Sequence, residues 1–261
     1  MPSPSPSPRR DHPRSRVVLP SDLLPASDQA LLAIQSLHDV SDPFDLLVAL
    51  YRATQAFGVR ASACVHVVPD PERATQVLLL LACDPDAAWA CRPAGAWLDH
   101  PWLRHARDHT EAVSASTLDA PPCAGTDGGP PPDLSPILIV PTHSGGGTGR
   151  FSGLMLDTTC LPGASPLAPE KCRLLAHSLA GELHEWWLRR TRAELQHHAR
   201  LRSDDLRMLE FERQGLGTKQ IARLLGISST AVDSRFQRIN AKLDVSSRRN
   251  AALRAAIHGL L

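Results

Sequence analysis

Apolar residues near the start of the chain recur at the spacing of two successive helices. Residues 27–39 place leucine and isoleucine side chains on one helical face, and Ser27 is suited to cap the first turn. In residues 43–57, Pro43 occupies a first helical position, where a missing N–H costs nothing, and Gly58 follows the last apolar residue. The pattern predicts two helices joined by a short turn.

Four later runs, rich in valine, isoleucine and leucine, have the length of strands. Ala61–Val68 and Thr75–Cys83 are separated by a turn that contains proline and aspartate, and residues 136–141 and 151–158 are separated by a glycine-rich turn. Short connections of this kind join antiparallel neighbours. The runs therefore predict a mostly antiparallel sheet.

A long helix is expected from about Pro166, because leucines and two tryptophans follow at helical spacing. A shorter helix is expected at residues 100–110. Residues 117–135 are rich in proline and glycine, and we expect an irregular loop there. Helices, a sheet and a long helix in this order predict an α+β domain.

Residues 215–248 have the pattern of a helix-turn-helix. A short amphipathic helix containing Ile221 and Leu225 is followed by Gly226, which suits a tight turn, and Ser228 can cap a second helix. Four apolar residues of the second helix recur at steps of about 3.6 residues and predict a buried stripe: Val232, Phe236, Ile239 and Leu243.

The opposite face of the second helix is polar and cationic. Such a face can bind base edges and phosphates, although a short basic helix pair is more often an ordinary solvated surface. We assign phosphate contacts to Lys219 and Arg248, and place Lys242 among the DNA-binding residues. Base edges or adjacent phosphates are assigned to five side chains: Ser229, Thr230, Ser234, Arg235 and Arg238.

The same segment closely resembles the C-terminal DNA-binding domain of the LuxR family. The shared positions are in register: Leu201, Gly215, Lys219, Ile221, Ala222, Leu225, Ile227, Ser228, Val232, Ile239, Lys242, Leu243, Val245, Arg248 and Ala251. The chain has Asp205, Ala231 and Arg235 where the family commonly has Glu, Thr and His. Because Arg235 adds a donor to the outer face, it is our candidate for a guanine contact.

The resemblance implies that the first domain is the family's autoinducer-binding domain, an α-β-α sandwich that holds an acyl-homoserine lactone between sheet and helices. In that comparison Asp99 matches the carboxylate that accepts the ligand's amide N–H. Trp89 matches a family tryptophan, but Pro93 stands where the family has a tyrosine. Trp97 and Trp102 complete the predicted ligand-binding set, because aromatics in a connecting segment can line a cavity, although tryptophans in such a segment more often pack in the core.

Charge is distributed unevenly along the chain. From Leu201 onward there are eleven Lys or Arg against six Asp or Glu, a net +5, so the preceding residues carry 17 against 21, a net −4. The basic part therefore coincides with the predicted DNA-binding part, which agrees with a polyanionic partner.

The remaining patterns favour a cytoplasmic protein that is not an enzyme. The longest apolar run, Val77–Cys83, is far shorter than the roughly 20 residues of a membrane span, and the Pro-rich basic N-terminus lacks the apolar core of a secretory signal. Six cysteines without a CxxC pair favour reduced thiols. Neither His105 with His109 nor the glycines of residues 145–149 complete a metal site or a nucleotide-binding loop. We expect no catalytic residues, no metal and no cofactor.

We therefore predict a disordered tail at residues 1–25, a ligand-sensing domain at 26–195, a linker at 196–200 and an all-α, four-helix DNA-binding domain at 201–261. The expected function is that of a quorum-sensing LuxR-type transcription regulator. It would bind double-stranded DNA as a homodimer on an inverted-repeat operator, controlled by an acyl-homoserine lactone or a divergent small molecule. The alternative is a sensing or interaction module that heterodimerises with another regulator rather than reading DNA.

Overall fold

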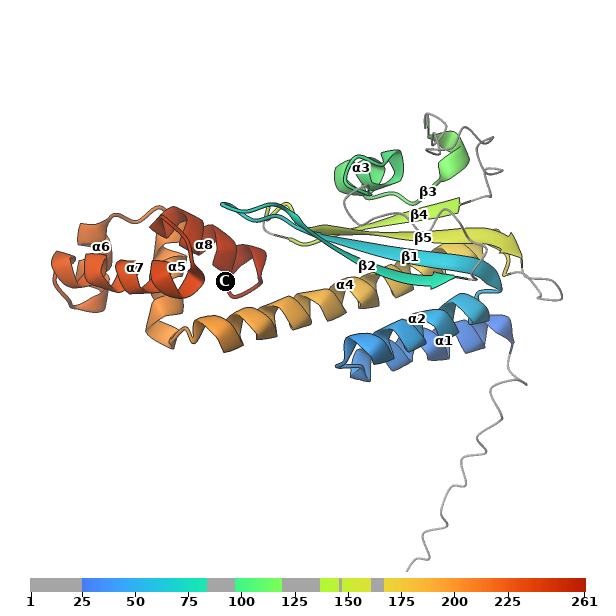
Figure 1. Ribbon diagram of the computed structural model, residues 1–261, viewed down its shortest axis with the longest axis horizontal. Coiled ribbons are helices and arrows are strands. Elements are labelled where there is room, and N and C mark those ends of the chain that lie inside the picture. The colour runs from blue at the N-terminus through green and yellow to red at the C-terminus, as the bar shows by residue number, and fades with distance from the viewer. Residues whose placement is uncertain (1–24, 84–96, 119–136, 146, 161–166) are drawn as a thin grey trace, which may run out of the picture.

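The molecule consists of a sheet covered by helices on both faces and a smaller helical domain, connected by one long helix (Figure 1). The computed structural model describes residues 25–83, 97–118, 137–145, 147–160 and 167–261. The long helix, α4 (Pro169–Ala199), runs beneath the sheet and continues beyond it to the helical domain. The predicted N-terminal tail lies outside the described residues.

The sheet has five strands in the order β2-β1-β5-β4-β3, and each neighbouring pair is antiparallel. Its strands are β1 (Val59–Val68), β2 (Gln76–Cys83), β3 (Val113–Ser114), β4 (Ile137–His143) and β5 (Phe151–Cys160). The antiparallel arrangement predicted from the four apolar runs is confirmed. Strand β3 was not predicted, because two residues are too few to show an alternating pattern.

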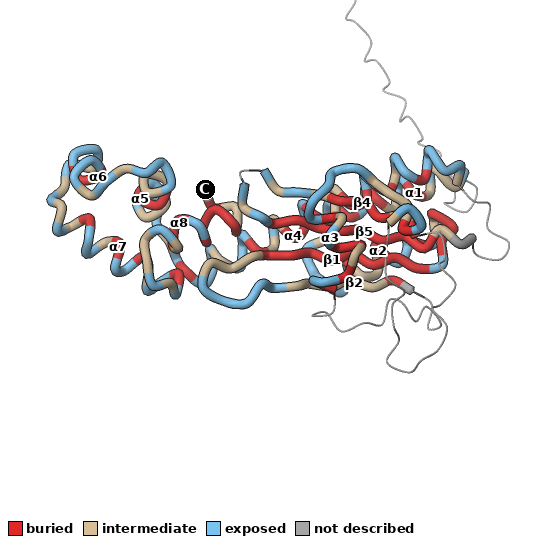
Figure 2. Tube along the Cα trace, turned by 90° about the horizontal axis from the view of Figure 1, so that it is seen from above, coloured by how far each residue is buried: buried red, intermediate tan, exposed pale blue. Residues whose placement is uncertain are grey.

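Apolar side chains cover both faces of the sheet, since successive residues of a strand point to opposite sides. On one face Cys64, Val140 and Leu154 pack with α1 (Ala26–Ser36), α2 (Pro43–Ala56) and α4. On the other face Val65 and Met155 pack with α3 (Pro101–Asp108). The central strands lie between these two layers (Figure 1) and are largely buried (Figure 2), and the predicted α-β-α sandwich is confirmed.

Helix α3 lies directly against the sheet at Gly153. A Cβ at this position would approach the Cβ of Ala106 to 3.0 Å and the side chain of Leu103 to 3.4 Å. The glycine therefore allows the helix to pack closely on β5.

The C-terminal domain contains α5 (Ser203–Arg213), α6 (Thr218–Leu225), α7 (Ser229–Leu243) and α8 (Arg248–Ile257). Helix α4 ends at Arg200, which adopts a left-handed conformation with φ of 45°. Gly226 ends α6 with φ of 64°, and the Ser228 hydroxyl accepts a hydrogen bond of 3.2 Å from the backbone N–H of Ala231. These contacts form the turn between the two helices of the predicted motif.

Within the described part of the chain, none of the helices combines the length and apolarity that a membrane span requires.

Candidate nucleic-acid interface and ligand pocket

Helix α7 buries one face and exposes the other. The apolar stripe is at most 4% exposed at Val232, Phe236, Ile239 and Leu243, which hold the helix in the domain core. Thr230, Ser234 and Arg238 are exposed, whereas Ser229 and Arg235 are half-buried. The residues assigned to DNA from the sequence thus lie on or beside the solvent-facing side of one helix.

Some cations of this surface are free to meet a polyanion. Lys219, Arg223 and Arg238 are exposed, and none of them has a carboxylate partner within 4.0 Å among the described residues. The hydroxyls of Ser228 and Thr230 share a hydrogen bond of 2.9 Å at the start of α7. Helices α6 and α7 lie far from the sheet (Figure 1), so the sensing domain does not cover this surface.

Other predicted DNA contacts are held by carboxylates of the domain itself. Lys242 Nζ lies 2.7 Å from Asp205 Oδ2, and Arg235 Nη1 lies 3.7 Å from Asp204 Oδ2. The hydrogen bonds from Lys242 and from the backbone N–H of Arg202, together with their charges, outweigh the effect of burial and lower the pKa of Asp205. These ion pairs connect α7 to α5, and DNA contacts by Lys242 and Arg235 stay predictions.

Arg248 connects three helices of the domain. Its Nε lies 3.1 Å from Glu212 Oε2, its Nη1 donates a 2.9 Å hydrogen bond to Thr218 Oγ1, and its guanidinium carbon lies 5.8 Å from the centroid of the Phe236 ring. A phosphate contact by Arg248 is not tested by these contacts and stays a prediction.

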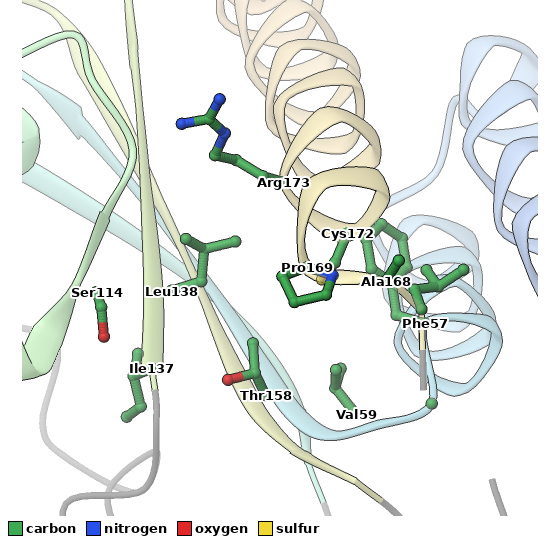
Figure 3. A pocket seen from close by; sticks show the side chains of 12 residues that line it. Phe57, Val59, Ser114, Ile137, Leu138, Thr158, Ala168, Pro169, Cys172 and Arg173 are labelled. Atoms are coloured by element: carbon green, nitrogen blue, oxygen red, sulfur yellow. The ribbon is translucent and has the colours of Figure 1, made fainter. Parts of the chain in front are cut away.

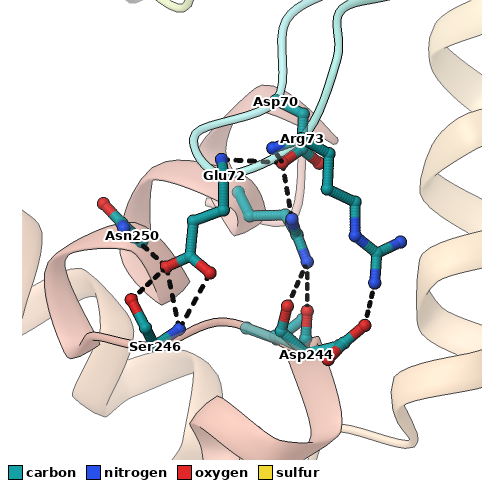
Figure 4. Close-up of polar contacts among 8 residues, drawn as sticks. Asp70, Glu72, Arg73, Asp244, Ser246 and Asn250 are labelled. Carbon is teal, nitrogen blue, oxygen red and sulfur yellow. Dashed lines mark hydrogen bonds and ion pairs between the residues drawn. The ribbon is translucent and has the colours of Figure 1, made fainter.

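The opposite end of the DNA-binding domain is docked on the sensing domain. In the β1–β2 turn, Asp70 Oδ1 accepts a 2.6 Å hydrogen bond from Arg254 Nη2 of α8 (Figure 4). The side chains are 9% and 6% exposed, so this is a buried ion pair. Arg254 Nη1 also donates to the carbonyls of Leu243 and Asp244, at 2.5 and 2.8 Å. Burial alone would raise the pKa of Asp70, but hydrogen bonds from the Glu72 N–H and from Arg254 lower it.

Two further side chains of the turn extend this contact. Glu72 accepts hydrogen bonds from the backbone N–H and hydroxyl of Ser246 and from Asn250 Nδ2, at 2.6 to 3.0 Å (Figure 4). Arg73 pairs with Asp244 at the end of α7. We call Asp70, Glu72 and Arg73 with their partners the docking contact. The sequence did not indicate it, because its halves are about 170 residues apart.

The predicted ligand-binding tryptophans lie on the α3 face of the sheet. Trp97 is fully buried, and its indole N–H has no hydrogen-bond partner among the described residues. The Trp97 and Trp102 rings lie 6.5 Å apart, with His100 between them at 5.5 and 4.5 Å. Asp99 is exposed, and Trp89 lies outside the described residues. Their roles in ligand binding stay predictions.

An apolar pocket of about 560 Å³ lies at one end of the sheet (Figure 3). It is lined on one side by the ends of α2 and α4 and on the other by the first residues of β4, including Ile137 and Leu138. Arg173 is the cationic side chain of the lining. The volume of this pocket is that of a small-molecule binding site.

A chain of buried polar groups crosses the α4 face of the sheet. The Ser152 hydroxyl lies 2.7 Å from both His66 Nδ1 and His184 Nδ1, and His184 Nε2 lies 3.0 Å from the Ser144 hydroxyl. Burial lowers the pKa of His184 to about 4. Burial, with the charge of His184, lowers the pKa of His66 to about 2. Both rings are therefore neutral at pH 7.

Within the described residues, no three His, Cys, Asp or Glu side chains are arranged to hold a metal ion. Cys64 and Cys172 are buried, and burial raises the pKa of Cys64 to about 12, so this thiol is a packing residue.

Comparison with known proteins agrees with this arrangement. Residues 204–255 match the model of the bacterial regulatory proteins of the luxR family. The curated proteins include none whose sequence matches the chain significantly. Among solved structures, SdiA in complex with octanoyl-rac-glycerol has a TM-score of 0.62 and 13% identity, over 89% of this chain and 95% of that one. A crystal structure of Escherichia coli SdiA has a TM-score of 0.62 and 15% identity, over 90% and 97%.

The family match covers the helix-turn-helix, and the structural match covers both domains. This is a family of transcription regulators rather than of enzymes. Residues 204–255 are therefore a LuxR-type DNA-binding domain, in a chain that has the fold of SdiA over nearly its whole length.

Proposed function

We propose that this chain binds an inverted-repeat operator as a homodimer and that a small molecule in the first domain controls this binding. The observation that carries the proposal is the exposed α6–α7 surface, where Lys219, Arg223 and Arg238 lack carboxylate partners among the described residues. Exposed unpaired cations on a LuxR-type helix-turn-helix suit a polyanion, since phosphate neutralisation supplies much of the affinity for DNA.

A homodimer is supported by exposed apolar side chains on the sensing domain. Phe44 and Tyr51 of α2 and Leu174 of α4 are 70%, 47% and 65% exposed. Large exposed apolar side chains suit a second copy of the chain. Two-fold symmetry would place two α7 helices in major grooves one helical turn, or a multiple of it, apart.

The ligand we propose has an apolar chain and a polar head with a carbonyl or hydroxyl oxygen. Two separate observations support this. The 560 Å³ apolar pocket at the end of the sheet suits an apolar chain. The indole N–H of Trp97, on the α3 face and outside the lining of that pocket, is buried without a partner among the described residues and suits an acceptor oxygen. A buried donor of this kind is costly unless an acceptor meets it. Octanoyl-rac-glycerol, bound by SdiA, and acyl-homoserine lactones both have this composition.

DNA binding is tested by selecting genomic fragments with the purified chain, followed by gel shifts at stated salt concentrations. We expect an enriched inverted repeat with two half-sites, bound far more tightly than random DNA. A chain that shifts no fragment, yet co-purifies with another regulator, would support the heterodimerising alternative and contradict the proposal.

The ligand site is tested by calorimetry with octanoylglycerol and an acyl-homoserine lactone panel. Trp97→Phe keeps an aromatic ring but removes the N–H, and we expect it to weaken binding by about 0.5 to 1.5 kcal/mol, or roughly two- to tenfold. Trp187→Phe is the matched control, because its indole N–H is also buried and unpartnered among the described residues, but Trp187 belongs neither to the lining of the apolar pocket nor to the cluster around Trp97. Equal loss in both variants would contradict the assignment of Trp97.

A further inference from the structure

A second, polar cavity lies between the two domains and is distinct from the apolar pocket. Its volume is about 380 Å³. The sensing domain contributes the β4–β5 turn and one face of α4, including His143, Thr148 and Arg150. The DNA-binding domain contributes Arg213 of α5 and residues at the end of α8. Its walls therefore belong to both domains.

Arg150 is a buried charged residue in the wall of this cavity. The residue is 3% exposed. Its Nε donates a 3.3 Å hydrogen bond to Ser144 Oγ, and its Nη1 donates a 3.1 Å hydrogen bond to Thr191 Oγ1. Its Nη2 lies close to Gly259 of the DNA-binding domain, since a Cβ built on that glycine would lie 3.7 Å from Nη2. Of the five N–H donors of a guanidinium, those on Nη2 have no acceptor among the described residues.

No described carboxylate lies within ion-pairing distance of Arg150. Burial lowers the pKa of Arg150 to about 10, partly opposed by the charge of Glu185, so the side chain is still protonated at pH 7. Among the described lining residues, Glu185 is the one acidic side chain, and it is exposed. A buried cation without a neighbouring anion is costly, and a bound oxyanion would offset this cost.

A second group in the cavity lacks a partner independently of Arg150. The hydroxyl oxygen of Thr148 is buried and has no hydrogen-bond partner among the described residues. A hydroxyl can donate to an anionic oxygen. A fixed guanidinium and a hydroxyl in the lining of the same cavity are both suited to bind phosphate or carboxylate oxygens.

We propose that this interdomain cavity binds a small molecule carrying a phosphate or carboxylate group, held by Arg150 and Thr148. The site goes beyond the proposed signal pocket, which is apolar and lies at the end of the sheet. Because residues of both domains line the cavity, a bound oxyanion stabilises the docked arrangement of the domains. The anion is thereby a second regulator, coupled to DNA binding through domain docking.

The experiment is calorimetric titration of the full chain, without DNA, with sodium phosphate, sodium succinate and sodium chloride at constant ionic strength. We expect saturable binding of phosphate or succinate and none of chloride, and comparison of the first two identifies the preferred oxyanion. Because no DNA is present, the result does not depend on operator binding.

Thr148→Val removes the hydroxyl while keeping the side-chain shape, and we expect it to weaken oxyanion binding about tenfold or more. Thr75→Val, at an exposed position of the β1–β2 turn, is the matched control and leaves affinity unchanged. Arg150→Lys keeps the charge but loses the planar fork and abolishes binding. Thr148→Val tests the site even if the Arg150 variant fails to fold. Absence of saturable binding, or equal affinity of wild type and Thr148→Val, would overturn the proposal.

Discussion

The two ends of the DNA-binding domain differ in how their charges are satisfied. At the α6–α7 end, Lys219 and Arg238 are exposed and have no ion-pair partner in the described part of the chain. At the α8 end, Arg254 is buried and paired with Asp70. Unpaired exposed cations are available to a partner outside the chain, whereas a paired buried cation fixes the position of one domain on the other. The DNA-binding domain thus has cations available to DNA at one end and a contact with the sensing domain at the other.

The largest expected effect comes from breaking the buried pair of the docking contact. Asp70→Ala leaves the Arg254 guanidinium buried and unpaired, and we expect this to destabilise domain docking by about 3 kcal/mol. Limited proteolysis near Arg200 measures the loss, because undocked domains expose the end of α4. Thr75→Val, in the same turn, is the control. Unchanged cleavage of Asp70→Ala would show that the domains are not held by this pair.

The buried histidines give a smaller, pH-dependent effect. His66 and His184 are neutral in the folded chain, with pKa values of about 2 and about 4, while in the unfolded chain they gain protons near pH 6.5. The free energy of unfolding is therefore unaffected by these groups above pH 6.5 and falls as the pH drops below it. Between pH 6.5 and 5, each histidine lowers it by up to about 2 kcal/mol.

Urea unfolding at pH 7 and pH 5, followed by tryptophan fluorescence, measures this loss. Trp187 stacks 5.7 Å from His66 and reports on the region. His184→Gln is expected to remove about half of the pH dependence. Equal urea midpoints at the two pH values would contradict the buried, neutral state of these rings.

The smallest expected effect is on the free energy of unfolding, which should differ between variants of a paired and of an unpaired cation on the DNA-binding domain. Lys242→Ala breaks an ion pair with Asp205 that is partly solvent-exposed, so we expect a loss of unfolding free energy of about 0.5 to 1 kcal/mol. Lys219→Ala breaks no such pair and leaves stability unchanged. Thermal unfolding of both variants compares them, and identical shifts would remove the distinction between the two kinds of cation.

Local patterns predicted the layers of the fold well. The apolar run of Ala61–Val68 and the helical spacing of Val232 to Leu243 each depend on neighbours in sequence, and both elements form as expected. Contacts between residues far apart in the sequence produce no local pattern of this kind. Asp70 lies in a polar turn of ordinary composition, and Arg254 lies on a basic helix, so nothing local indicates their pairing.

The candidate sites were predicted less completely for the same reason. The sequence places Lys219, Lys242 and Arg248 together as cations near a reading helix, but only the fold distinguishes the unpaired one from the two that hold neighbouring carboxylates. The sequence did not predict a role for Arg150, because the burial of this residue depends on α4 and α8 packing around a turn between two strands.

We propose that the exposed face of α7 reads DNA while nearby cations bind its phosphates. The most direct measurement is the affinity of Lys219→Ala and Arg235→Ala for the selected operator and for random DNA over a range of salt. Lys219→Ala should weaken both complexes and reduce the slope of log affinity against log salt by about one. Arg235→Ala should weaken the operator complex alone, by about 1 to 3 kcal/mol, and relax the base preference at one position. If the two variants affected operator and random DNA identically, this assignment of the α7 face would be wrong.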